Sequence, residues 1–519
     1  MTVLKVVAAG ILILVTITSV GPVHAATAKQ HTTLARINGI PTLIVDGQPF
    51  LIVGAQCDVW RSTPQDDQTV LFFDSYRDMN ATTVGLDVLW DRCEHVQDQY
   101  DFAFLDWFVE QARSRHLKLI LHLFDTNVCG GVTDSPKWSY TPAYILSAPD
   151  KYQRMVLQYE YRPSGPPMCP NDPDTLQRER KYLVKLAEHI RDTDTDRTVI
   201  MLQINNEYYF QQWVSHAYDA SVRCQCSYCN AKYDPAKYKD PKDFMFHSFV
   251  DYTKVLTDAI AEVYDIPLYV NSPGWPDWAV PMFLDGCPNL DLVGCDCQTS
   301  PAEPNMISRY VQGRNITFAA ECATPNPRCR VNLDVLPYYT MIGRMGIGTL
   351  LWECGMPLTV SRNPVWSKRY ADAMYPIKNA QWAIARARGT ENIVGWYVIR
   401  EFQADAKLQD PTIVGEKMFV REGRKTRMED GITFTASLGS HRITVGGSTA
   451  GIVASSEPGV LVIATAKADL TISGPAIKSA AEGVYVGDKW QSTAKLDLKL
   501  SGDAYELHVD QPKVVRLLF

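Results

Sequence analysis

Short apolar runs alternate with longer stretches of helical periodicity between about residue 40 and residue 400. This alternation is typical of a parallel sheet that is covered by helices. The helical pattern is clearest in "DFAFLDWFVEQARSR", where Phe102, Leu105, Phe108 and Ala112 share one face. The predicted strands span residues 50–56, 81–90, 117–124, 198–205, 267–272, 290–296, 316–321 and 347–353.

Eight parallel strands with intervening helices predict a (β/α)8 TIM barrel, whose functional residues lie at the C-terminal ends of the strands. An open doubly wound sheet is the structural alternative. It would usually carry a glycine-rich turn after its first strand. The sequence there reads "GAQCDVWR", which is not such a turn, so the barrel is favoured.

The pattern changes after residue 400 to period-two alternation between turn residues, as in "HRITVGG", "VLVIATA" and "VVRLLF". Ser501-Gly502-Asp503 predicts a hairpin turn. We therefore predict a C-terminal all-β sandwich domain over residues 401–519, a common size for that class. It contains no evident catalytic cluster, and a packing or spacer role is favoured over carbohydrate binding.

The first 25 residues contain one early lysine and then an apolar stretch, and they end in "VHA". This is typical of an export signal. The alternative is an N-terminal membrane anchor, but no stop-transfer charges follow. We expect the mature chain to begin near Ala26, with the barrel over residues 26–400. It is then secreted or periplasmic, has no membrane contact after cleavage, and works where disulfides are permitted.

The chain has 519 residues, of which 46% are hydrophobic and 21% are charged, as expected for globular domains with a sizeable core. The net charge is −7, and no stretch is strongly basic. Nucleic acid and anionic membranes are therefore poor partners, and a neutral ligand is easier to accommodate. These observations leave a monomer and an oligomer both open.

Two carboxylates end predicted barrel strands. Glu207 follows Asn206 in "QINNEYYF" after the fourth strand, and Glu321 ends the seventh in "ITFAAECA". Two carboxyl groups in one barrel mouth are the equipment of a glycosidase, in which one protonates the leaving oxygen and the other attacks the anomeric carbon. Solvated loop acids are the ordinary alternative. Both residues follow strongly apolar runs, which favours catalysis.

These segments also carry a family resemblance. "QINNEYYF", "LWDRCEHVQDQYDFAFLDWFVEQA" and "CQCSYC" resemble retaining glycoside hydrolases of the Asn-Glu barrel clan, closest to the β-galactosidases of families 42 and 35. The resemblance covers about residues 40–360. It implies that Glu207 is the acid/base and Glu321 the nucleophile, without a catalytic cofactor. It also implies a β-galactoside or oligosaccharide substrate. A β-glucosidase, a β-mannosidase and a non-catalytic carbohydrate-binding barrel are the alternatives.

Further candidates for substrate binding lie near the strand ends, where flat rings stack on sugars and polar groups hold hydroxyls. Trp352 resembles the aromatic platform of the clan. Core packing is the ordinary alternative for the other tryptophans, and bracing of a loop is the alternative for the polar residues. Besides Trp352, the candidates are Asn206, Trp275, Asp58, Asp125, Asn205 and Glu353.

Cys224, Cys226 and Cys229 form a C-x-C-x-x-C cluster after the fourth strand, and Cys129 follows the third. Spacings this short are those of tetrahedral zinc sites. Some family 42 enzymes resemble this arrangement, which implies a structural zinc held by the four thiolates. Disulfides are the alternative in an exported protein, with Cys169, Cys322 or Cys329 as partners.

Overall fold

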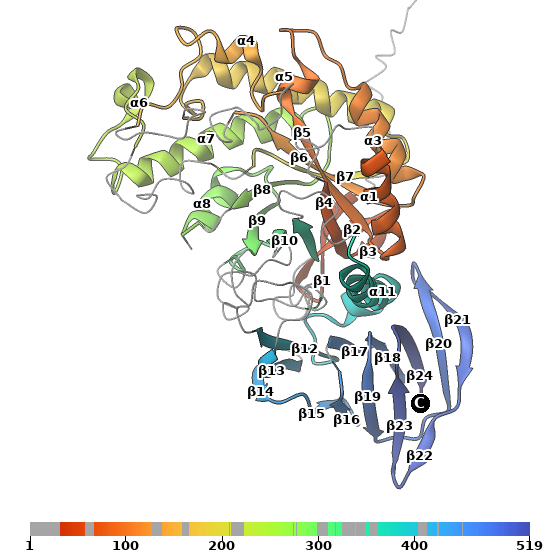
Figure 1. Ribbon diagram of the computed structural model, residues 1–519. Coiled ribbons are helices and arrows are strands. Elements are labelled where there is room, and N and C mark those ends of the chain that lie inside the picture. The colour runs from red at the N-terminus through yellow and green to blue at the C-terminus, as the bar shows by residue number, and fades with distance from the viewer. Residues whose placement is uncertain are drawn as a thin grey trace, which may run out of the picture. The chain divides into compact units, whose positions relative to one another are not determined.

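Eight parallel strands close into a barrel in the computed structural model (Figure 1). Their order is β10-β11-β4-β5-β6-β7-β8-β9. The strands are β4 (Ile52–Cys57), β5 (Thr83–Leu89), β6 (Lys118–Phe124), β7 (Val199–Gln203), β8 (Leu268–Ser272), β9 (Leu292–Cys297), β10 (Phe318–Ala323) and β11 (Gly348–Trp352). The predicted TIM barrel is thus confirmed, with every predicted strand found within two residues at either end.

The structure describes residues 32–57, 67–126, 138–157, 166–206, 208, 223–272, 275–276, 278–297, 310–316, 318–323, 338, 348–352, 362–402, 413–422, 425–448 and 450–519. The helices in these ranges are α1 (Asp67–Asp78), α2 (Trp90–Cys93), α3 (Ala103–Arg113), α4 (Ala143–Leu146), α5 (Pro173–Thr193), α6 (Ser227–Lys232), α7 (Pro241–Ala261), α8 (Ala279–Gly286) and α11 (Pro364–Ala387). None of these helices has the length and hydropathy that crossing a bilayer requires.

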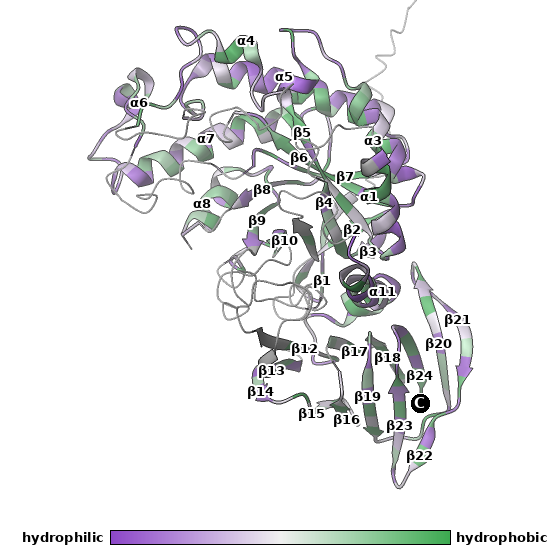
Figure 2. Ribbon diagram, viewed as in Figure 1, coloured by the Kyte–Doolittle hydropathy of each residue, from purple (hydrophilic) through white to green (hydrophobic). Residues whose placement is uncertain are grey.

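Burial explains why the barrel strands are apolar. All the side chains of β4 and β5 are buried, because a parallel strand packs against helices on one side and the barrel interior on the other. Figure 2 shows β5, β6 and β7 as mainly hydrophobic ribbons, whereas α3 and α5 also carry hydrophilic residues. On α3, Leu105, Phe108 and Ala112 are buried, as its periodicity predicts.

The longest covering helix before β7, α5, begins where its sequence provides the right cap. Pro173 occupies the first turn, where its missing N–H costs nothing, and the Asp172 carboxylate accepts from the backbone N–H groups of Asp174 and Thr175. The buried side of α5 includes Glu179, Tyr182 and Leu186. Glu179 is the charged residue on this buried side, so it needs hydrogen-bond partners inside the protein.

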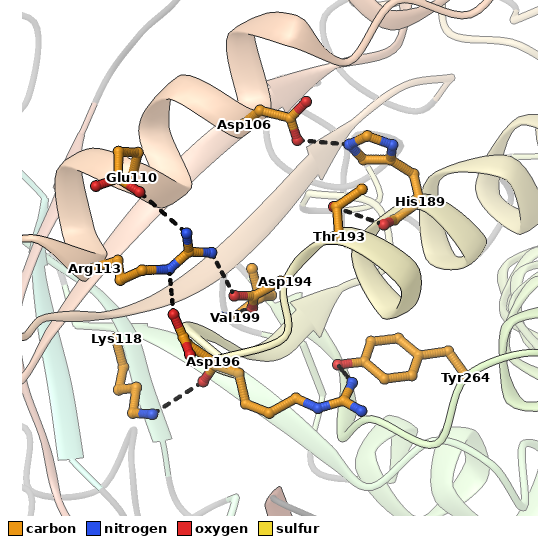
Figure 3. A network of polar contacts seen from close by, with 11 residues as sticks. Asp106, Glu110, Arg113, Lys118, His189, Thr193, Asp194, Asp196, Val199 and Tyr264 are labelled. Carbon is orange, nitrogen blue, oxygen red and sulfur yellow. Dashed lines mark hydrogen bonds and ion pairs between the residues drawn. The ribbon is translucent and has the colours of Figure 1, made fainter.

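A polar network lies at the N-terminal end of β6 and β7, opposite the end where barrel active sites lie (Figure 3). Arg113 at the end of α3 donates to Glu110 over 3.1 Å and to Asp194 over 3.3 Å, and its Nε lies 3.0 Å from Asp196. Asp194 also accepts from the backbone N–H of Val199 over 2.8 Å. The network therefore ties α3 to the turn between α5 and β7.

The C-terminal region is antiparallel. Its strands are β12 (Ile393–Phe402), β13 (Ile413–Glu422), β14 (Lys425–Asp430), β15 (Phe434–Leu438), β16 (His441–Gly446), β17 (Ala450–Glu457), β18 (Val460–Thr465), β19 (Ala468–Ser473), β20 (Ser479–Val486), β21 (Lys489–Leu496), β22 (Lys499–Ser501), β23 (Ala504–Val509) and β24 (Lys513–Leu518). One sheet has the order β14-β13-β12-β17-β18-β24-β20-β21, and the other the order β15-β16-β19-β23-β22. A buried apolar cluster that includes Trp396, Phe434, Ile443 and Leu470 draws on strands of both sheets, as in a sandwich. The hairpin at Gly502 is confirmed, since Ser501 pairs with Ala504 across it.

Three further elements lie outside the predicted pattern or on its boundary. A small N-terminal sheet is formed by β1 (Thr32–Ile37), β2 (Ile40–Val45) and β3 (Gln48–Phe50). The strand β12 crosses the predicted domain boundary at residues 400 and 401, and α11 contacts β17, β18, β20 and β24.

Candidate active site

Glu321 is a buried carboxylate in β10, with 4% of its surface exposed. Asn271 on β8 donates from Nδ2 to Glu321 Oε1 over 2.9 Å and to Asp296 Oδ1 over 2.8 Å. The side-chain Oδ1 of Asn271 accepts from the backbone N–H of Ser272 over 3.0 Å, which fixes the orientation of the side-chain amide. Since β9 lies between β8 and β10, one amide links side chains of three successive strands.

Asn206 joins this group from the end of β7. Its Oδ1 accepts from Gln203 Nε2 over 2.8 Å and lies 3.5 Å from Asn271 Nδ2. Asn206 is 6% exposed. Glu207, the predicted acid/base, lies outside the described residues. The structure therefore brings Asn206 and Glu321 together through Asn271, and the position of the Glu207 carboxyl relative to Glu321 stays a prediction.

A second polar group lies inside the barrel on the first three strands. Asp87 Oδ1 accepts from Gln56 Nε2 over 3.1 Å and lies 3.2 Å from His122 Nδ1. Burial lowers the pKa of His122 to about 3, so the imidazole is neutral near pH 7 and its Nδ1 donates to Asp87. A Cβ added to Gly85 would lie 2.4 Å from His122 Cε1, so glycine leaves the space that the ring fills.

The predicted substrate contacts differ in what the structure says of them. Trp352 ends β11 and pairs with Gln56 of β4, which places its backbone at the predicted strand end, but its side chain lies outside the described residues. Asp58 and Glu353 also lie outside them. Substrate contact by all three stays a prediction.

Asp125 and Trp275 are described, and both are buried inside the protein, at 0% and 1% exposure. Asp125 follows β6, and its Oδ1 accepts from the backbone N–H of Thr126 over 2.9 Å, while the Thr126 hydroxyl donates to Glu179 of α5 over 2.7 Å. Trp275 packs between aromatic rings, with centroids 4.4 Å from Phe283 and 5.9 Å from Tyr208. Asp125 thus belongs to a buried polar group and Trp275 to a buried aromatic cluster. Direct contact with substrate stays a prediction for both residues.

The site residues predicted from the sequence do not include Asn271, Asp296, Asp87 or His122. Each is a polar residue inside an otherwise apolar strand run, as in "PLYVNS" and "LDLVGCD". Polar residues at such positions are buried and need partners. That signal was present in the sequence, although the identity of the partners was not.

Four buried thiols converge at one point. The Sγ of Cys169 lies 3.5 Å from that of Cys226, 3.4 Å from that of Cys229 and 4.0 Å from that of Cys224. These sulfurs all lie within 4.8 Å of one another, and none is in a disulfide. From the sequence, Cys169 was expected only as a disulfide partner, and Cys129 was predicted as the fourth ligand. Cys129 lies outside the described residues.

The geometry of this cluster fits a tetrahedral metal. Four sulfurs each about 2.3 Å from a central zinc are about 3.8 Å apart, which is close to the separations observed. N–H groups also point at the sulfurs: Val156 N donates to Cys224 over 3.3 Å, and Asn171 donates to Cys169 and Cys229 over 3.4 and 3.3 Å. Such donors stabilise thiolates and orient metal ligands. The four sulfurs leave no position for a water ligand.

Part of the chain that contains this site is similar to a known protein family. Residues 66–265 match the model of glycoside hydrolase family 42, described as beta-galactosidase. This range holds Asn206 and the four clustered cysteines, and ends before Glu321. The resemblance inferred from the sequence is thereby confirmed: residues 66–265 are similar to a glycoside hydrolase domain of family 42.

Among solved structures, a beta-galactosidase from the haloarchaeon Halorubrum lacusprofundi is similar at 14% identity with a TM-score of 0.47, over 63% of this chain and 58% of that one. The exo-beta-1,4-mannosidase Op5Man5 from Opitutaceae bacterium strain TAV5 is similar at 14% identity with a TM-score of 0.41, over 66% of this chain and 61% of that one. The chain thus spans about three fifths of both. A beta-galactosidase from Bacillus circulans sp. alkalophilus has 11% identity and a TM-score of 0.47, with coverage of 91% and 99%. No curated protein sequence matches the chain.

Proposed function

We propose that this chain is an exported, retaining β-glycosidase that removes terminal β-galactosyl residues from glycosides or oligosaccharides. The observation that carries the proposal is the buried Glu321 carboxylate on β10, held by Asn271 beside Asn206 at the end of β7. The match of residues 66–265 to the family 42 model supports the reaction class. The apolar stretch and the "VHA" sequence within residues 1–25, which predict an export signal, support the proposed location.

In this proposal Glu321 is the nucleophile. The amide of Asn271 donates to Glu321 Oε1, and a hydrogen bond to the charged form of a carboxyl group favours ionisation. The ionised carboxylate attacks the anomeric carbon, forms a glycosyl ester and expels the leaving oxygen. Glu207 protonates that oxygen. It then removes a proton from the water that cleaves the ester, so the β configuration is retained.

This mechanism requires the two carboxyl groups to lie about 5–5.5 Å apart, because a larger separation of about 6.5–9.5 Å would admit a water and give inversion. Azide distinguishes the two roles. Glu207→Ala should still form the glycosyl-enzyme from an aryl β-galactoside with a good leaving group, and azide should then release the β-galactosyl azide. Glu321→Ala should be inactive, or give the α-azide when azide rescues it. Wild-type turnover in both variants would place the catalytic acids elsewhere.

A panel of aryl glycosides tests the sugar. Turnover of the β-galactoside at least tenfold above the β-glucoside and β-mannoside would support the proposed specificity. A preference for either of the other sugars would keep the mechanism and change the substrate. Absence of turnover on every glycoside, with the protein folded and the metal content complete, would indicate a carbohydrate-binding protein on the same barrel.

The cysteine cluster is proposed to hold a structural zinc through Cys169, Cys224, Cys226 and Cys229. The donor set is four thiolates, which closes the coordination sphere and excludes a bound nucleophilic water. The residues themselves connect the segment before α5 to the segment around α6. Metal binding there contributes to folding free energy rather than to a step of the reaction.

A further inference from the structure

Two buried carboxyl groups share Thr126 as a hydrogen-bonding neighbour. Asp125 follows β6, and Glu179 belongs to α5. Both side chains are fully buried, at 0% exposure. Thr126 connects them, since its backbone N–H donates to Asp125 Oδ1 over 2.9 Å and its hydroxyl donates to Glu179 Oε2 over 2.7 Å. Neither residue has a role in the mechanism above, and two isolated carboxylates would be too costly to bury side by side without a proton or other compensation.

Donors from three other elements converge on Glu179. Asn205 Nδ2 donates to its Oε1 over 2.9 Å. Thr126 Oγ1 donates to its Oε2 over 2.7 Å, and the Tyr252 hydroxyl of α7 donates to the same oxygen. Thus both oxygens of Glu179 act as acceptors, and the proton that the pair needs belongs to Asp125.

The titration of the pair agrees with that assignment. Burial raises the pKa of Asp125 well above its usual range, and the charge of Glu179 raises it further. Burial also raises the pKa of Glu179 to about 7, against hydrogen bonds from Asp125, Thr126 and Asn205 that lower it. The two protons leave in coupled steps. The second proton, on Asp125, leaves only at higher pH.

Asn205, the residue that Glu179 holds, has an unusual backbone. Its φ is 58°, in the left-handed region that non-glycine residues adopt rarely and asparagine adopts most easily. In a regular strand, residues three apart point to opposite faces. The left-handed residue interrupts this alternation between Gln203 and Asn206, and Gln203 Nε2 donates to Asn206 Oδ1 over 2.8 Å.

We propose that Asp125 and Glu179 form a proton-sharing pair that acts as a positioning device: Glu179 anchors Asn205 in its left-handed conformation and thereby places Asn206 beside the Asn271–Glu321 contact. The inference rests on the proposed β-glycosidase function for its kinetic consequence. Asp125 and Glu179 are positioning residues, since they act on the site through Asn205 and Asn206.

The other titratable groups that face the pair from the described residues are phenols. They are Tyr252 on α7, Tyr182 on α5 and Tyr208 after β7. Burial raises the pKa of Tyr182 and of Tyr208 well above its usual range, so both stay neutral. No described cation is hydrogen-bonded to Asp125 or Glu179, so a proton is what compensates their charge.

The kinetic experiment compares two variants by kcat per active site, counted by trapping with a 2-deoxy-2-fluoro galactoside. Glu179→Gln keeps an oxygen that accepts from Asn205 and should stay within about threefold of wild-type kcat. Glu179→Ala removes the acceptor and should lower kcat by about 30-fold or more with a change in KM below threefold. Wild-type kcat per site in Glu179→Ala would overturn the positioning role.

The stability experiment tests the shared proton without any substrate. The folded state holds a proton on Asp125 that the unfolded chain releases near pH 4. Raising the pH above 4 should therefore increase the unfolding equilibrium constant of the wild type relative to Asp125→Asn, by up to tenfold per pH unit, until Asp125 ionises in the folded state. A ratio that does not change with pH would overturn the proton-sharing pair.

Asp291→Asn is the matched control. Burial also raises the pKa of Asp291, which accepts from the backbone N–H of Leu268 at the other end of the barrel. This variant should alter pH-dependent stability and leave kcat per site unchanged. A wild type inactive on every glycoside would contradict the proposed function alone. The crystal structure of Glu179→Ala would then decide the positioning role, since Asn205 should leave the left-handed region, and an unchanged φ would overturn the inference.

Discussion

Asn271 Nδ2 donates to Glu321 Oε1 over 2.9 Å from a strand that is not the neighbour of β10. The intervening strand contributes Asp296, which accepts from the same nitrogen over 2.8 Å. Asn271 thus uses both its amide hydrogens to hold two carboxylates in one row. That amide therefore orients the carboxylate that is proposed to attack the sugar.

Substitution of Asn271 should therefore damage the chemical step. We expect Asn271→Ala to lower kcat by about 100-fold, because the ionised Glu321 loses a donor that also screens it from Asp296. Steady-state kinetics on an aryl β-galactoside measure the effect. Asn315→Ala is the control, since Asn315 is also buried but bonds to the backbone of Val293 and Tyr310. Equal losses of kcat in the two variants would contradict the assignment.

His122 should make the protein sensitive to acid. Its folded-state pKa is about 3, whereas an unfolded histidine titrates near 6.5, so only the unfolded chain takes up this proton as the pH falls between those values. Stability is therefore lost with falling pH, by up to about 1.4 kcal/mol per pH unit. Urea unfolding from pH 7 to pH 4 should show this loss in the wild type relative to His122→Gln. Parallel curves for the two proteins would contradict a neutral buried imidazole.

The metal site predicts a stability effect that precedes any effect on chemistry. Cys169→Ser should reduce bound zinc below one per chain and lower the unfolding temperature, because one of four thiolates is lost. Elemental analysis and thermal unfolding measure both. Cys93→Ser is the matched control, since Cys93 is also a buried thiol but contacts Tyr182 at 3.6 Å away from the cluster. Wild-type zinc content in Cys169→Ser would contradict the ligand set.

The network of Figure 3 predicts a loss of stability without a loss of activity. Arg113→Met leaves the buried Asp194 with its backbone donor but without its cation, which should lower the free energy of unfolding by about 1–3 kcal/mol. Lys495→Met is the control, because Lys495 and Asp497 are 82% and 93% exposed and such pairs contribute about 0–1 kcal/mol. A fall in kcat per site in Arg113→Met would show coupling to the barrel mouth.

The sequence by itself determined the barrel and the place of its nucleophile candidate. Strands buried on both sides must be apolar along their whole length, so eight apolar runs separated by helical periods were enough to locate β4 to β11. Strand ends meet at one rim of a barrel, which is why Glu321 could be selected from a run of six letters. The three short strands before β4 lack such a run and were not predicted.

Only the tertiary structure decided which polar side chains meet. Asn271 and Glu321 are 50 positions apart, Cys169 and Cys229 are 60 apart, and Asn205 and Glu179 are 26 apart on different elements. Periodicity reports which face of an element is buried, but it says nothing about which residue of another element lies opposite. The choice of Cys169 as fourth thiol and of Asn271 as the partner of Glu321 depends on strand order and helix packing, because a hydrogen bond or a metal–sulfur bond requires atoms within a few ångströms.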